Sequence, residues 1–271
     1  MTFHLRKAQP ADASAAGDIC YRAFKAIAEA HNFPPDFPNA ETASGMLAWF
    51  LGHESIYGLV AEMNGKIVGS NFLDERNPVS GIGPITIDPA VQNDGAGRAL
   101  MEAVMRRSEE QGFAGIRLVQ AGYHNRSLAL YLKLGFQPRE QLAVIQGHAI
   151  GKVPPGYHVR AAAPSDLAAC NELSVRVHGH DRGGELTDAI AQGTARVVER
   201  SRRVTGYTTS IGFGGHAVAE TNDDLAALIA SAESFVGPGF LVPTRNAALL
   251  RWCLGEGLRI AQTMTLMSIG L

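Results

Sequence analysis

Residues 85–104 have the sequence ITIDPAVQNDGAGRALMEAV, which is the most informative stretch of the chain. A short β-rich run places Ile85 and Ile87 on one face, and the apolar spacing after residue 97 predicts an amphipathic helix. Between them lie Gly95 and Gly97, which lack Cβ and so let the backbone approach a ligand closely. Since the amides of a first helical turn have no partners within the helix, the stretch predicts a phosphate cradle at a helix N-terminus.

Two other phosphate-binding motifs fit this stretch less well. A Rossmann dinucleotide turn needs a glycine where Leu100 stands and follows its strand tightly, whereas six residues separate Asp88 from Gly95. A P-loop needs Gly-Lys-Ser/Thr, which this loop lacks. A surface loop without a ligand and a nucleotide-binding oxidoreductase remain as alternatives.

Two motifs in this chain resemble those of the GCN5-related N-acetyltransferase (GNAT) superfamily. Residues 92–99, QNDGAGRA, resemble the acetyl-CoA loop of that family. Residues 125–136, NRSLALYLKLGF, resemble its last conserved helix, with the terminal Tyr and Gly-Phe. Both motifs occur in the family's order and at its usual separation, and the resemblance covers about residues 3–150.

The resemblance implies an α+β fold and an acyl-CoA-dependent N-acyltransferase that uses acetyl-CoA as the acyl donor. An amine of a small molecule or peptide would attack the thioester directly, in a ternary complex with no acyl-enzyme. The resemblance makes Tyr131 the catalytic acid for the departing thiolate, and a core aromatic is the alternative, because Leu128, Tyr131 and Leu132 form an apolar stripe. The residues implied to hold the cofactor are Ile85, Ile87, Gln92, Asn93, Asp94, Gly95, Ala96, Gly97, Arg98, Ala99, Asn125 and Ser127.

No residue stands out as the general base or as the acceptor site. Asp74, Glu75 and Asp88 lie at the ends of predicted strands and are candidate bases, although solvated carboxylates are common there. Glu29 and Asp36 are candidates for an acceptor pocket, and His124 is a candidate substrate contact.

The chain also contains an internal similarity. Residues 4–24 align with 158–178 at an offset of 154 residues, and Asn125 aligns with Asn246 at an offset of 121. We therefore predict two copies of one GNAT-like fold, residues 1–151 and 157–271, joined at a Pro/Gly-rich linker. The elements predicted for the first copy are strands 3–7, 57–63, 66–74, 82–88, 114–120 and 140–147, and helices 11–30, 41–51, 98–111 and 126–134.

The second copy is predicted to be degenerate. It shows no equivalent of the hairpin signal at Asn64-Gly65, and residues 185–203 are instead predicted to form one helix. Its strand–loop–helix segment has no glycine loop, and Asn222 is predicted to cap a helix with two aspartates in its first turn. Trp252 falls where the first copy has Tyr131. We infer that this half does not bind CoA and that it covers or shapes the acceptor site of the first half.

Composition excludes several classes of partner. The 271 residues carry a net charge of −2, which gives no overall attraction to nucleic acid or to an anionic membrane. The three cysteines form no C-x-x-C pair, and neither a signal peptide nor a membrane span is indicated, so we expect a cytoplasmic protein without a metal site. The alternative function is a non-catalytic acyl-CoA-binding or regulatory protein, and the sequence leaves monomer or homodimer open.

Overall fold

The computed structural model describes residues 3–271, which divide into two compact units. The first unit is Met1–Arg139 with Thr265–Leu271, and the second is Glu140–Met264. Two long strands, β7 (Gln137–Gln146) and β13 (Arg259–Ile269), contain residues of both units. The units therefore differ from the predicted halves 1–151 and 157–271, because most of β7 packs with the second unit and the chain's last residues pack with the first.

The first unit is built on a mixed sheet. Its strands follow the order β1 (His4–Lys7), β2 (Ile56–Met63), β3 (Lys66–Asp74), β4 (Val79–Ile82) and β6 (Gly115–Ala121), and the end of β13 follows β6. The short strand β5 (Thr86–Ile87) pairs with β3 only. Asn64 and Gly65 link β2 to β3 with φ values of 52° and 72°, as the Asn-Gly signal predicts for a tight hairpin.

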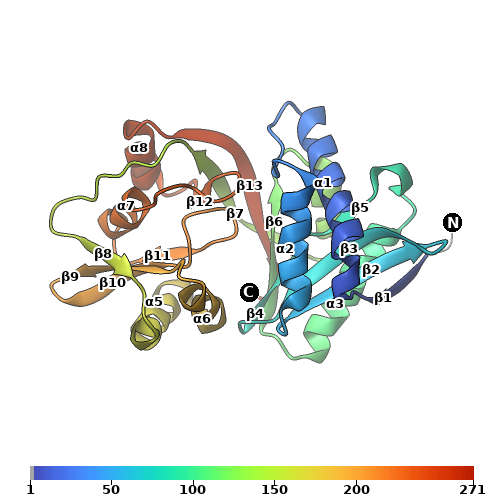
Figure 1. Cartoon of the computed structure of the whole chain (residues 1–271), viewed down its shortest axis with the longest axis horizontal. Coiled ribbons are helices and arrows are strands. Elements are labelled where there is room, and N and C mark those ends of the chain that lie inside the picture. Colours follow the sequence, from blue (N-terminus) through green and yellow to red (C-terminus); the bar gives the residue numbers. More distant parts are fainter. Residues whose placement is uncertain (1–2) are drawn as a thin grey trace. The chain divides into compact units, whose positions relative to one another are not determined.

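Helices cover both faces of this sheet. On one face, α1 (Ala13–Ala30) and α2 (Ala40–Gly52) bury Cys20, Leu47 and Phe72 in a common core, and the two helices lie side by side in Figure 1. On the other face, α3 (Ala96–Glu110) and α4 (Asn125–Lys133) pack on a second core of β2, β3 and β6 residues. This arrangement places the N-termini of α3 and α4 on the same face of the sheet.

The second unit repeats this architecture in a shorter form. Its four-stranded sheet has the order β11 (Ala217–Ala219), β10 (Arg203–Thr208), β9 (Arg196–Arg200) and β8 (His158–Ala161), and β12 (Phe240–Pro243) pairs with β7. One face carries α5 (Leu167–His178) and α6 (Gly183–Ala191), and the other carries α7 (Asn222–Ala230) and α8 (Ala247–Gly255). The predicted α+β class is confirmed.

An equivalent ion-pair network lies at the first strand of each unit. In the first unit Arg6 makes two hydrogen bonds to Asp12, at 2.7 and 2.9 Å, and one to Glu62 at 2.8 Å. In the second unit Arg160 bonds Asp166 at 2.7 and 2.8 Å and also bonds Glu199. Asp12 and Asp166 each accept a backbone N–H from the residue three positions earlier. The predicted correspondence at an offset of 154 residues therefore holds at the level of side-chain contacts.

The single helix predicted over residues 185–203 is wrong. The structure has α6 up to Ala191, followed by the β9–β10 hairpin, which turns at Ser201 and Arg202 with φ values of 52° and 60°. The second unit thus has the hairpin that the sequence seemed to lack. Neither turn residue is Gly or Asn, so the usual sequence signal for this turn is missing.

The equivalence of Tyr131 with Trp252 is also wrong by one residue. Helices α4 and α8 each span nine residues, and their caps His124 and Asn246 are 122 residues apart. At this offset Tyr131 corresponds to Cys253, which is fully buried, and burial raises the pKa of its thiol to about 11. The second unit still lacks a phenol at this position.

Candidate active site

The ladder of the first sheet is interrupted beside β6. Strand β4 pairs in parallel with β6 only from Val79 to Gly81, opposite Gly115 to Arg117. After this point the chain leaves β6, and β5 pairs with β3 instead. The strand predicted over 82–88 is therefore two short strands, and they diverge from the second half of β6.

Gly69 allows β5 to lie close to β3. A Cβ at Gly69 would come within 2.5 Å of the Ile87 side chain and 2.7 Å of the Thr86 carbonyl oxygen. The Asp88 amide donates to the Val68 carbonyl at 2.8 Å, and hydrogen-bonded pairs alternate along an antiparallel ladder. The pair Gly69–Ile87 is therefore of the non-hydrogen-bonded kind, and the N–H of Ile87 points away from β3.

The N-terminus of α3 has no side-chain cap. Gly95 is the N-cap residue and adopts a left-handed conformation with φ of 89°, and no acidic residue lies in the first turn. Gly97 lies inside the helix, and an added Cβ there would meet only the Ile87 side chain, at 3.5 Å. The amides of Ala96, Gly97 and Arg98 are thus available to an anion, as the glycine loop predicts.

Long-range contacts hold the glycine loop. Gln92 donates from Nε2 to the Ile87 carbonyl at 3.2 Å, and Arg126 donates to the side-chain oxygens of both Gln92 and Asn93. Arg126 of α4 therefore places a guanidinium beside the loop that is predicted to hold phosphates. Arg126 is not among the predicted site residues, although it stands inside the Asn125-Arg-Ser motif.

The N-terminus of helix α4 lies near the glycine loop, since Arg126 in its first turn contacts Gln92 and Asn93. His124 caps it, because His124 Nδ1 accepts the backbone N–H of Ser127 at 3.2 Å. Burial, together with the positive charge of Arg126, lowers the pKa of His124, so its imidazole is neutral near pH 7. The Ser127 hydroxyl contacts the His124 carbonyl oxygen at 3.0 Å and Gln120 Oε1 at 3.3 Å, whereas Asn125 is exposed.

Tyr131 lies on the inner face of α4 and is only 7% exposed. Its ring packs edge-on against that of Phe136 within the core cluster, with the ring centroids 6.0 Å apart. This packing agrees with the alternative that Tyr131 is a core aromatic. Burial raises the pKa of the phenol to about 12, and its hydroxyl has no hydrogen-bond partner among residues 3–271. The phenol is thus protonated at neutral pH, which both interpretations allow.

The three candidate bases are held in ion pairs. Arg22 binds both carboxylate oxygens of Asp88, at 3.0 and 3.1 Å, and these hydrogen bonds lower the pKa of Asp88. Burial disfavours the charge on Asp74, but its bonds to Arg76 outweigh this effect and lower its pKa as well. Arg107 likewise binds both oxygens of Glu75, at 2.7 and 2.9 Å. The lowered pKa values make Asp74 and Asp88 poor proton acceptors.

An aromatic cluster joins the α1–α2 connection to the loop before α4. Phe33 stacks on Tyr123 with ring centroids 4.5 Å apart, and His31 lies 5.2 Å from the same ring. Burial, with the charge of Asp36, raises the pKa of Tyr123 to about 12. Of the two predicted acceptor-pocket residues, Asp36 thus lies near this cluster, whereas Glu29 is exposed and pairs loosely with Lys25 at 3.8 Å.

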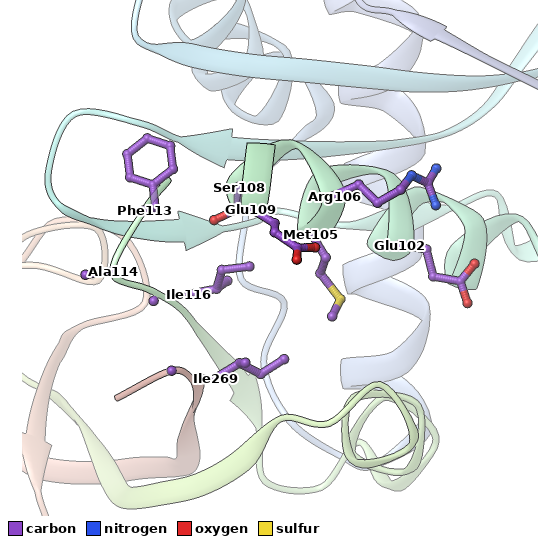
Figure 2. A pocket seen from close by; sticks show the side chains of 11 residues that line it. Glu102, Met105, Arg106, Ser108, Glu109, Phe113, Ala114, Ile116 and Ile269 are labelled. Atoms are coloured by element: carbon purple, nitrogen blue, oxygen red, sulfur yellow. The ribbon is translucent and has the colours of Figure 1, made fainter. Parts of the chain in front are cut away.

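Two cavities of the first unit are lined by residues outside the glycine loop. One, of about 510 Å³, is lined by the second half of α3, the start of β6 and the residues Ile269 and Gly270 (Figure 2). The other, of about 500 Å³, lies between α1 and the β2–β3 hairpin and includes Arg22 and Asp88. At 1.5 Å per helical residue, Ser108 in the first cavity is about 16 Å along α3 from Gly97.

The equivalent helix terminus of the second unit is closed. Thr221, and not Asn222 as predicted, caps α7: its hydroxyl accepts the Asp224 amide at 3.2 Å and donates to the Asp224 carboxylate at 2.5 Å. Asp223 and Asp224 lie in the first turn. Negative side chains therefore occupy the positive end of this helix and would repel a phosphate.

The first unit combines helices on both faces of a mixed sheet, a diverging strand pair and an uncapped helix after a glycine loop. The sequence model of the acetyltransferase (GNAT) family matches residues 23–136. This match covers less than half of the chain, and it shows that this segment is similar to the family.

A curated relative matches a smaller part of the chain. A mycothiol acetyltransferase of Amycolatopsis mediterranei (strain U-32) is 32% identical over 90 residues, which is 30% of this chain and 30% of that protein. The matched region is thus less than a third of the relative's length.

Within residues 3–271, no helix has the length and apolar character that crossing a membrane requires.

Solved structures resemble the whole chain. A structure from Pyrococcus horikoshii has a TM-score of 0.76 at 18% identity and covers 99% of this chain and 89% of its own. A tandem GNAT protein from the clavulanic acid biosynthesis pathway has a TM-score of 0.59 at 13% identity, with coverage of 99% and 98%. At these identities the likeness concerns the fold alone, and it confirms the predicted arrangement of two GNAT-like parts.

Proposed function

We propose that this protein transfers an acyl group, acetyl in the first instance, from acyl-CoA to an amine of a small molecule or peptide. The observation that carries this proposal is the uncapped N-terminus of α3, where Gly95 and Gly97 leave the amides of one helical turn open. Arg126 adds a positive charge beside that turn. This surface suits the pyrophosphate of acetyl-CoA, and the gap between β5 and β6 suits the arm that carries the thioester.

The residues around this gap fit direct acyl transfer. Attack by a neutral amine forms a C–N bond and breaks the thioester C–S bond, so the amine loses one proton and the thiolate gains one. The N–H of Ile87, which points away from β3, is positioned to hydrogen-bond the carbonyl oxygen as negative charge develops on it. Because Asp74, Glu75 and Asp88 are ion-paired, we assign no side chain as the base.

Tyr131 is proposed as the acid that stabilises the leaving sulfur. A free thiol has a pKa of about 8.5, well below the value of about 12 that burial gives this phenol. Complete proton transfer from Tyr131 to the thiolate is therefore unfavourable in the unliganded protein. A hydrogen bond to the developing thiolate does not require complete transfer and is the role we assign to the hydroxyl.

The second unit is proposed not to bind CoA, because Thr221, Asp223 and Asp224 fill the helix terminus that corresponds to the glycine loop. The other predicted cofactor contacts, among them Ile85, Asp94, Ala99, Asn125 and Ser127, remain proposals for the first unit.

The test is an acetyl-transfer assay with acetyl-CoA and a panel of amines, with detection of free thiol and mass spectrometry of the products. Amines related to mycothiol belong in the panel because of the name of the relative described above. Acetylation of at least one amine supports the proposal. Tight CoA binding without any acetylated product would favour the alternative, a non-catalytic acyl-CoA-binding protein, and absence of CoA binding would refute both.

A further inference from the structure

Gln120 carries a buried amide that the protein pairs at one end only. It lies in β6 and is 4% exposed, and its side chain is on the same face of the strand as Ile116 and Leu118. Its Oε1 lies 3.3 Å from the Ser127 hydroxyl. Its Nε2 is buried and has no hydrogen-bond partner in the part of the chain that the structure describes.

Exchanging the amide oxygen and nitrogen does not remove this deficit. Ser127 has a single hydroxyl hydrogen, and its shorter contact, at 3.0 Å, is with the carbonyl oxygen of His124. If that hydrogen goes to His124, a reversed Gln120 amide can donate to Ser127 Oγ, but its own oxygen is then buried without a protein partner. In both orientations one polar end of the amide is unpaired, which disfavours the unliganded state.

The position of this amide connects it to the candidate site. Gln120 lies in β6 beyond Arg117, the last residue that pairs with β4, so it belongs to the part of β6 from which β5 has diverged. Ser127 and Tyr131 are four residues apart on α4 and therefore share one face of the helix. Ser127 therefore contacts the Gln120 amide and shares a helix face with Tyr131.

We propose that Gln120 binds the pantetheine arm of acyl-CoA through a hydrogen bond from the unpaired end of its amide to an amide of the arm. This inference rests on the proposed function. The pyrophosphate is assigned to the N-terminus of α3 and the thioester to Tyr131, so the arm must lie between them. The arm carries two secondary amides, each with a donor and an acceptor, and it can therefore satisfy Gln120 in either orientation.

The experiment compares Gln120→Leu with the wild-type protein by calorimetric titration of CoA and by thermal unfolding without ligand. Leucine is close in size and has no polar atom, so the unliganded variant is expected to unfold at the same or a higher temperature. Its affinity for CoA is expected to fall about 5- to 30-fold, the range for losing one buried hydrogen bond. Adenosine 3′,5′-bisphosphate, which lacks the arm, is expected to bind both proteins equally.

Gln262 supplies a matched control. It is 6% exposed, its Oε1 also has no hydrogen-bond partner among the described residues, and it belongs to the second unit. Gln262→Leu is therefore expected to leave CoA affinity unchanged. If Gln120→Leu does not fold, Gln120→Met, of similar length and greater flexibility, serves as the second variant.

Three results would overturn the inference. Unchanged CoA affinity in a folded Gln120 variant would make the amide a structural feature only. An equal loss of affinity for CoA and for adenosine 3′,5′-bisphosphate would place the effect outside the arm. Wild-type protein that binds no CoA would refute the proposed function and this inference with it, and that outcome is seen before any variant is made.

Discussion

Replacing Gly97 by glutamate should strongly weaken cofactor binding and yet stabilise the unliganded protein. Gly97 lies in the first turn of α3, and a Cβ added there has ordinary contact with Ile87 at 3.5 Å and no closer neighbour. Replacing a helical glycine gains up to about 1 kcal/mol in helix propensity. An acidic side chain near a helix N-terminus gains about 0.3–1 kcal/mol more.

The same carboxylate opposes a phosphate bound at this turn. Two unit charges about 5 Å apart repel by about 3 kcal/mol at an effective dielectric constant near 20. This energy corresponds to a loss of about 100- to 300-fold in CoA affinity. The melting temperature of the unliganded variant is expected to rise by about 2–4 °C, as for 1 kcal/mol in a chain of this size.

The assay combines calorimetric titration of acetyl-CoA with thermal unfolding of the unliganded protein. Gly97→Gln is the matched control, because it has the same bulk without the charge and should lose less affinity than Gly97→Glu. The difference between the two variants should shrink as salt concentration rises. A folded Gly97→Glu variant with wild-type affinity for acetyl-CoA would refute the assignment of the glycine loop.

Three further predictions concern the rest of the site. Titration should find one CoA site per chain, since α7 is closed by its own side chains, and two equivalent sites would contradict this. Tyr131→Phe should lower turnover by about 10²- to 10³-fold, as for the loss of one hydrogen-bond donor to developing negative charge. CoA affinity and melting temperature should change little, because the hydroxyl has no partner among the described residues; near-normal turnover would remove Tyr131 from the mechanism. Since the folded-state pKa of His124 lies below its ordinary value of 6.5, the unfolded chain binds more protons in the window below 6.5, and stability should fall as the pH drops through it. His124→Asn, which copies the Asn246 cap of α8, should show a smaller fall in melting temperature between pH 7 and 5 than the wild type does, and an identical pH profile would rule out this role for His124.

The sequence predicted the elements around the glycine loop well and those of the second unit less well. Strands β2 and β3 lie within one residue of their predicted bounds, because alternating side chains and Asn64-Gly65 are strong local signals. The β9–β10 hairpin was missed because Ser201 and Arg202 adopt positive φ without being Gly or Asn. Only the pairing of two strands makes that conformation favourable there, and a sequence pattern does not record the pairing.

The features that could be predicted from sequence alone are local ones. Gly95 and Gly97 before an amphipathic run specify an open helix N-terminus, because dihedral freedom and helical period depend on neighbouring residues. Which polar groups find hydrogen-bond partners depends on the tertiary structure. Arg22 forms an ion pair with Asp88, 66 positions further along the chain. The Gln120 amide contacts Ser127 through its oxygen, and its nitrogen has no partner among the described residues. An ion pair or an unpaired amide depends on which distant side chains the folded backbone brings within about 3 Å, and that distance is fixed only when the sheet and helices pack together.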